Sequence, residues 1–166
     1  MTLADPQLLT GLGSALSIFL AGAGSAIASS EGAIYARRKK GVIAFVPIII
    51  SGVLSIYGII IAIILVGKMA SSSEQEMTEV SGYRHLSAGL AVGLASLVSG
   101  LGIARFLNHL NKEAVIAIED DLECSKAQPL VQHGEEPNFV NLAFGLIFLE
   151  AIALYGLIVA LFLIGK

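Results

Sequence analysis

One carboxyl, Glu150, lies in the middle of an otherwise apolar run from Phe139 to Ile164. At mid-bilayer such a side chain costs about 3 kcal/mol on insertion scales, and each surrounding Leu, Ile, Phe or Val returns about 0.3–0.6 kcal/mol. The segment can therefore still insert into a membrane. An intramembrane carboxyl is by default an ion or proton site. The alternative is a structural hydrogen bond between helices. Desolvation favours the neutral acid where Glu150 faces lipid.

The groups expected near Glu150 favour a proton over a sodium ion. Sodium needs several oxygen ligands, and the neighbouring apolar segments offer only a few hydroxyl groups. No Asn or Gln lies at mid-depth in the second or third apolar segment, whereas a proton needs only the carboxyl itself. We expect H⁺ as the transported ion, Na⁺ less so, and no cofactor. The hydroxyls in question are Ser51, Ser55, Ser96, Ser99 and Tyr155, and the expected supporting residues near the site are Tyr155, Gly52 and Ser55.

Other catalytic or metal-binding patterns do not occur in this sequence. His85, His109 and His133 do not have metal-ligand spacing, and the single cysteine, Cys124, lies beside acidic residues that disfavour a reactive thiolate. Glu31, near the end of the first apolar segment, is a second-rank candidate. We predict no metal site, no nucleic-acid partner and no catalysis by the chain on its own.

Composition identifies the elements that must position Glu150. Of 166 residues, 55% are hydrophobic and only 14% are charged, and the mean hydropathy is +0.83. Spanning a hydrocarbon core of about 30 Å takes about 20 apolar residues in a helix. Four segments qualify, so we predict an all-α membrane protein. They run from about Leu8 to Ile34, Val42 to Val66, His85 to Leu110, and Phe139 to Ile164.

Small residues at four-residue spacing mark the first and third segments. In lipid, such residues let helix backbones approach closely. The pattern fits either ordinary packing inside a monomeric bundle or a tightly packed oligomer. The first segment carries Gly13, Ser17, Ala21, Ser25 and Ser29, and the third carries Ser96, Gly100 and Ala104.

The chain contains an internal repeat. Residues 56–62 (IYGIIIA) match residues 154–160 (LYGLIVA) at an offset of 98, and Gly22 and Gly24 match Gly100 and Gly102 at an offset of 78. We therefore predict two tandem helical hairpins, residues 1–67 and 85–166, joined by a non-cytoplasmic loop 68–84. A polar cytoplasmic loop, 111–138, interrupts the second hairpin. The counterpart of Glu150 is Gly52, so only one hairpin carries the carboxyl.

The basic residues predict the orientation. Six of the ten lie between the first and second segments or between the third and fourth, and a seventh, Arg105, lies near the end of the third segment on the same side. Lys and Arg favour the cytoplasmic side. Both termini are therefore expected on the opposite, lumenal side.

These motifs resemble a known family. Val46-Pro47, Ser51-Gly52, Ile56-Tyr57-Gly58 and the final run from Phe148-Leu149-Glu150-Ala151 to Leu161 are similar to the proteolipid c subunit of vacuolar-type H⁺-ATPases. The resemblance covers all four segments.

The resemblance implies a ring of proteolipid subunits in the membrane sector, turned by ATP hydrolysis in a separate soluble sector. The residue matched by Glu150 would carry a proton past the lipid bilayer and release it beside an arginine of the stationary a subunit. The first and third helices would line the inner ring, and central stalk subunits would be further partners. A vacuolar or other acidic endomembrane is the implied location.

Some features depart from the c pattern. The acidic loop from Asn111 to Glu136 is longer than the family's usual turn, and residues 82–89 (GYRHLSAG) are similar to the c″ proteolipid. The position of Glu150 favours c. A small monomeric proton-coupled carrier or channel, and a c″-like or structural proteolipid, remain as alternatives.

Overall fold

The computed structural model describes residues 5–38, 42–71, 78–124 and 139–165, and this part of the chain is helical. Four of its helices contain a segment long and apolar enough to cross a membrane. This confirms the prediction of an all-α membrane protein with four spans. The elements are α1 (Pro6–Arg38), a short 3₁₀ helix η1 (Val42–Phe45), α2 (Val46–Ser71), α3 (Glu79–Cys124) and α4 (Phe139–Ile164).

Local sequence explains where several helices begin and end. Pro6 opens α1, where its missing N–H needs no partner, and the Asp5 carbonyl accepts a hydrogen bond from Leu9 N at 3.1 Å. Arg37 and Arg38 occupy the last turn, where cations complement the helix dipole. Before α3, the Thr78 carbonyl accepts a hydrogen bond from Ser81 N at 2.9 Å.

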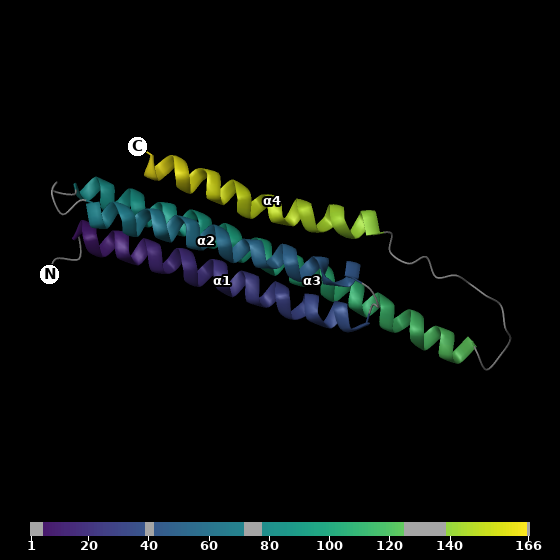
Figure 1. Cartoon of the computed structure of the whole chain (residues 1–166). Helices are drawn as coiled ribbons and strands as arrows, with labels where there is room; N and C mark the ends of the chain where they lie inside the picture. The colour runs from purple at the N-terminus through teal and green to yellow at the C-terminus, as the bar shows by residue number, and fades with distance from the viewer. Residues whose placement is uncertain (1–4, 39–41, 72–77, 125–138, 166) are drawn as a thin grey trace.

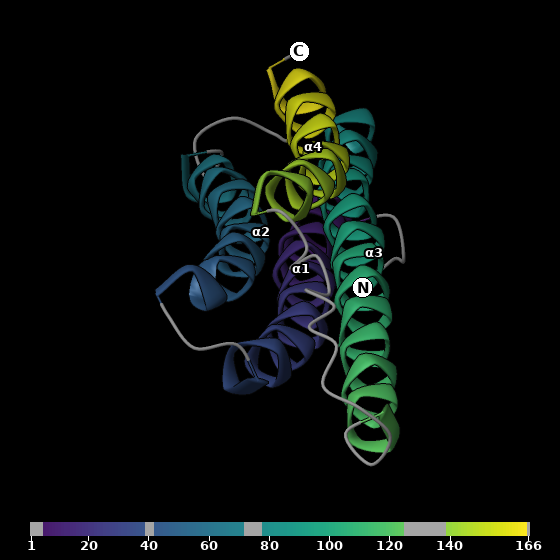
Figure 2. The same cartoon turned by 90° about the vertical axis from the view of Figure 1, so that its right-hand side faces the viewer.

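The helices run side by side as two antiparallel pairs, α1 with α2 and α3 with α4 (Figures 1 and 2). Contact is most extensive between α1 and α3, then between α1 and α2 and between α3 and α4, and smaller between α2 and α4. The start of α1 and the end of α4 lie at the same end of the bundle (Figure 1). The inner pair α1 and α3 therefore holds the outer helices in place.

The contact between α1 and α3 is made backbone to backbone at glycines. A Cβ built on Gly13 would lie 2.7 Å from the His85 carbonyl oxygen, and one on Gly24 would lie 2.6 Å from that of Ser96. A Cβ on Gly89 or Gly100 would collide with the backbone of Gly13 or Gly24, respectively. Because eleven residues make about three turns, both glycine pairs share one face of each helix.

Most of the other small residues predicted to pack helices are also buried, and Ser29 is half-buried. Ser17 is fully buried, and its single hydroxyl proton is shared between the Ser14 carbonyl at 2.7 Å and the Gly58 carbonyl of α2 at 3.1 Å. The α1–α2 contact is therefore polar as well as close. The remaining members with low exposure are Ala21, Ser25, Ser96 and Ala104.

The structure differs from the sequence prediction at the polar segments. α3 continues past Leu110 to Cys124, where a loop was expected from Asn111, and α2 and α3 extend into the expected loop 68–84. Residues 111–124 are polar but contain no Gly or Pro. A helix of 46 residues rises about 70 Å, over twice the hydrocarbon thickness, so its end can continue in water. The rest of both predicted loops, 72–77 and 125–138, lies outside the described residues.

We expect Gly100→Leu to destabilise the chain, because its side chain would occupy the space of the Gly24 backbone. Overpacking of this kind costs about 1–3 kcal/mol or more. Thermal unfolding of the purified chain in detergent measures the effect. Gly67→Leu is the matched control, since nothing lies within 4 Å of a Cβ at Gly67, and its stability should change by less than about 0.5 kcal/mol. Equal midpoints for the two variants would contradict the glycine contact.

Candidate functional site

The carboxyl of Glu150 is held by a tyrosine from the other hairpin. The Tyr57 hydroxyl on α2 donates a hydrogen bond to Glu150 Oε1 on α4 at 3.0 Å. Both side chains are half-buried. The site therefore lies where the two outer helices meet, partly open to the surroundings of the chain.

Gly58 follows Tyr57 in α2, and Gly156 follows Tyr155 in α4. These two glycines set the rotation of the outer helices about their axes. Gly58 packs α2 against Ser17 and Ala21 of α1, and Gly156 packs α4 against Ala95 of α3. Each of these glycines faces an inner helix. Because successive residues of a helix are turned by about 100°, Tyr57, next to Gly58, is directed toward α4. The same geometry turns Glu150 toward α2.

A second polar contact fastens α4 beside the carboxyl. The buried Ser99 hydroxyl of α3 donates to the Leu149 carbonyl at 2.6 Å. Leu149 is the residue before Glu150, so this bond fixes the position of the site along the axis of α3. Ser99 thus positions the backbone of α4 and does not bond to the carboxyl.

The predicted supporting residues lie near Glu150 in sequence or repeat position but do not bond to it. Tyr155 is 66% exposed, because five residues turn a helix by about 140° away from Glu150. The Ser55 hydroxyl donates to the Gly52 carbonyl of its own helix at 2.8 Å. Nothing lies within 4 Å of a Cβ built on Gly52. Tyr57 was not among the predicted site residues, although the repeat identifies it as the counterpart of Tyr155.

The other hydroxyls considered as sodium ligands have different roles in the described part of the chain. Ser51 donates to the Ile48 carbonyl and pairs with Ser29, both at 2.8 Å. Ser96 is fully buried, and its hydroxyl has no hydrogen-bond partner among the described residues. No group of three or more His, Cys, Asp or Glu suited to a metal is found in residues that the structure describes.

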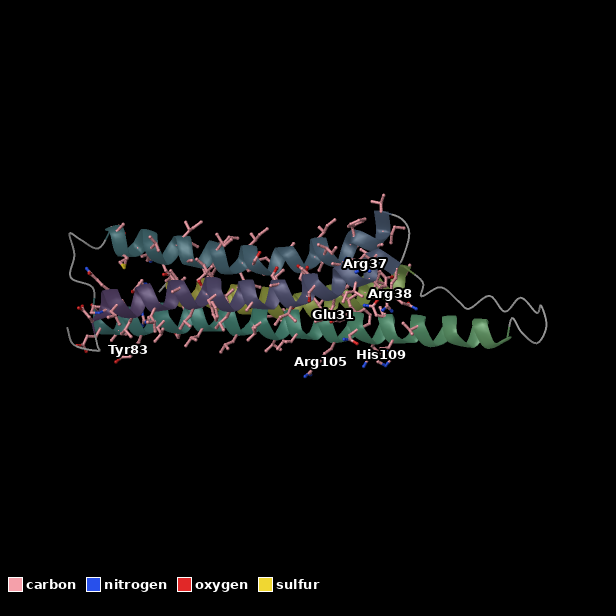
Figure 3. The ribbon with its side chains drawn as sticks, turned by 90° about the horizontal axis from the view of Figure 1, so that it is seen from below. Glu31, Arg37, Arg38, Tyr83, Arg105 and His109 are labelled. Atoms are coloured by element: carbon pink, nitrogen blue, oxygen red, sulfur yellow. The ribbon has the colours of Figure 1, made fainter. Side chains whose placement is uncertain are left out.

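Several charged residues of the described chain lie toward one end of the bundle. Glu31, Arg38 and Arg105 gather at one end, whereas Tyr83 lies at the other (Figure 3). There Asn108 Nδ2 donates to Glu31 Oε1 at 3.5 Å and Arg38 donates to the Asn111 carbonyl at 2.8 Å. Neither α4 nor α2 before Lys68 contains Lys or Arg. The two helices that form the site therefore bring no cation to it.

Several known proteins are similar in sequence to this chain, and all of those described below are subunits of one type of ATPase. The V-type proton ATPase subunit c′ of Candida glabrata is 33% identical over 161 residues, which cover 93% of this chain and 85% of the relative. The 16 kDa proteolipid subunit c of the V-type proton ATPase is 32% identical in Ascaris suum, over 98% of this chain and 86% of the relative. The same subunit of Nephrops norvegicus is 30% identical, over 87% of this chain and 88% of the relative. No family model matches the chain.

The four spans and a single mid-span carboxyl define an integral, multi-pass membrane proteolipid. At this identity and coverage, the chain belongs to the family of V-type proton ATPase proteolipid subunits. It is accordingly a non-catalytic subunit of a proton-transporting ATPase.

We expect Tyr57→Phe to increase the rate at which a carboxyl-reactive carbodiimide modifies Glu150. The Tyr57 hydroxyl occupies one carboxyl oxygen, and a hydrogen bond of this kind contributes about 0.5–1.5 kcal/mol, or roughly a two- to tenfold change in rate. The rate is measured by mass spectrometry of the labelled chain. Tyr155→Phe is the control and should react as the unmodified chain does. An unchanged rate in Tyr57→Phe would show that the contact does not restrain the carboxyl.

Proposed function

We propose that Glu150 is the proton-carrying group of a rotary proteolipid ring, protonated and deprotonated once per passage of the subunit during ATP-driven proton transport. The observation that supports this most directly is the contact between Tyr57 and Glu150 at 3.0 Å. A hydroxyl can donate to an oxygen of either the carboxylate or the neutral acid. Tyr57 can therefore hold the carboxyl in place in both states.

The surroundings of Glu150 support H⁺ rather than Na⁺ as the transported ion. The described hydroxyls of Ser51, Ser55 and Ser99 bond to backbone carbonyls. Their protons are directed to these carbonyls and not to the carboxyl, and Tyr57 is the hydroxyl that bonds to Glu150 among the described residues. One hydroxyl oxygen beside the carboxyl provides too few ligands for a sodium ion, whereas a proton on Glu150 needs no further ligand.

Release of the proton requires a charge from outside the chain. A cation placed beside a carboxyl group favours its charged form, from which the proton has left. Because α4 and the apolar part of α2 carry no Lys or Arg, we assign this cation to an arginine of the stationary a subunit. The half-buried carboxyl between the outer helices can meet such a residue at the ring's periphery.

The remaining partners follow from the same proposal. α1 and α3, joined through glycine, face the inside of the ring, and α2 and α4 face outward. The end of α3 beyond Leu110 extends past the other helices (Figure 1) and would lie near the central stalk. An acidic endomembrane with both termini on the lumenal side is the proposed setting. With Gly52 in place of a second carboxyl, each subunit carries one proton.

We expect Glu150→Gln to abolish ATP-driven proton uptake into vesicles that contain the whole complex, because glutamine cannot exchange a proton. Acidification is followed with a pH-sensitive dye, and immunoblotting confirms that the subunit is assembled. A carboxyl-reactive carbodiimide should likewise modify Glu150 and stop proton uptake.

Glu31→Gln is the matched control, since Glu31 lies at the end of the bundle beside Asn108, and pumping should persist. Normal acidification by assembled Glu150→Gln complexes would refute the proposal.

A further inference from the structure

Two adjoining cavities lie between α1 and α3, at the end of the bundle where Arg38 and Arg105 gather (Figure 3). Their volumes are about 380 Å³ and 420 Å³. Glu31, Asn108 and Lys112 line both of them. The two cavities therefore form one continuous groove, which we call the basic groove. It is separate from the Tyr57–Glu150 contact, which lies between the outer helices.

One face of each inner helix forms the walls of the basic groove. The wall on α1 contains Ile27, Glu31, Ile34 and Arg38. The wall on α3 repeats the same spacing of four, three and four residues with Leu101, Arg105, Asn108 and Lys112. Residues three and four apart are neighbours on one face of a helix. The groove is therefore built by two matching stripes that face each other.

The described walls of the groove have a net positive charge. Arg38, Arg105 and Lys112 are three fixed cations, whereas Glu31 is the one carboxyl among the described lining residues. Glu31 Oε1 already accepts a hydrogen bond from Asn108 Nδ2 at 3.5 Å. An anionic group fits this charge better than a neutral or cationic one.

Asn111, in the same wall, contains a hydrogen-bond donor that has no acceptor. Asn111 is only 7% exposed, and its backbone carbonyl accepts a hydrogen bond from Arg38 Nη1 at 2.8 Å. Its side-chain Nδ2 is buried and has no hydrogen-bond partner among the described residues. Because buried polar atoms nearly always have a partner, we expect an acceptor oxygen from outside the described residues. A ligand in the groove can provide one.

The basic groove changes from apolar to basic along its length. Ile27 and Leu101 form its inner end and are 40% and 38% exposed. Arg38 and Lys112 each follow eleven residues later and end the two candidate spans, so the two ends of the groove lie about 16 Å apart along the helices. A ligand that fills the groove therefore needs an apolar part at hydrocarbon depth and an anionic part at the membrane surface.

We propose that the basic groove binds an anionic glycerophospholipid, with its phosphate at Arg105 and Lys112 and an acyl chain along Ile27 and Leu101. Phospholipids in a bilayer have this arrangement, with the phosphate at the surface and the chains directed inward. The groove lies at the predicted cytoplasmic end, and the cytoplasmic leaflet contains the anionic lipids. An acidic segment of a soluble partner matches the charge but not the apolar inner end. The proposal does not depend on the proton-carrying role of Glu150.

The first test measures lipid binding to the full chain in detergent by native mass spectrometry. Dioleoyl phosphatidylglycerol should bind more tightly than dioleoyl phosphatidylcholine, which has the same chains and no net charge. The double substitution Arg105→Gln and Lys112→Gln should weaken binding of phosphatidylglycerol roughly thirtyfold, about fivefold for each cation. Equal affinity for the two lipids in the unmodified chain would overturn the proposal.

The matched control removes two cations that line neither cavity. Arg37 and Arg84 are exposed, and the substitutions Arg37→Gln and Arg84→Gln together change the net charge by the same amount. This variant should bind phosphatidylglycerol as the unmodified chain does, and the thermal midpoint shows whether each variant is folded. An equal loss of binding in both double variants would show attraction by overall charge and would overturn the site.

Inorganic phosphate distinguishes a lipid from a free anion. In large excess over the lipid, and at matched ionic strength, it should not displace phosphatidylglycerol, because it makes no contact with the apolar end of the groove. Displacement by phosphate, but not by chloride, would identify a free-anion site and contradict lipid binding.

A second measurement needs no substitution and uses whole complexes in membranes. Phosphatidylglycerol with a photoreactive diazirine at the end of one acyl chain should cross-link to α1 and α3 near Ile27 and Leu101. Phosphatidylcholine with the same chain is the control and should label these positions much less. Equal labelling by both lipids, or cross-linking of the groove to another protein in place of lipid, would refute the proposal.

Discussion

The direct backbone contact between α1 and α3 is the constraint on which the rest of this structure depends. In lipid, apolar side chains gain little by leaving one environment for another, so helices associate through close van der Waals packing and hydrogen bonds. Glycines at positions 13, 24, 89 and 100 provide that approach. α2 and α4 then dock on the outside of this pair, each with a glycine turned inward, and this arrangement sets the direction of every functional side chain on them.

The chemistry at Glu150 follows from two repeated hairpins, of which only the second carries a mid-span carboxyl. Both outer helices carry a tyrosine two positions before an apolar Ile or Leu, but only α4 carries the carboxyl. Placed side by side, the hairpins bring the tyrosine of one to the carboxyl of the other, 3.0 Å apart. The site is therefore a property of the pair of hairpins and of neither one alone. A polar group in lipid needs a partner to be tolerated, and the tyrosine of the first hairpin is that partner.

Much of the fold was predictable because its signals are strong. Long apolar runs require helices in a membrane, and the final helix has the predicted bounds, Phe139–Ile164. The extent of α3 was not predictable from hydropathy. Residues 111–124 are too polar to span a membrane, but they continue the helix beyond it, since polarity excludes a residue from lipid and does not exclude it from a helix. Orientation relative to the membrane stays a prediction.

The sequence by itself determined that the chain has four spans and two repeated hairpins, with one carboxyl at mid-span, because composition and periodicity encode burial in lipid directly. Only the tertiary structure decided which side chain meets that carboxyl. Tyr155 is nearer in sequence, yet a helix turns it away, and Tyr57, 93 residues distant along the chain, donates the hydrogen bond. Contacts between helices depend on the rotation of each helix about its axis. That rotation is fixed by where glycines allow backbones to touch, which becomes known only when the helices are packed.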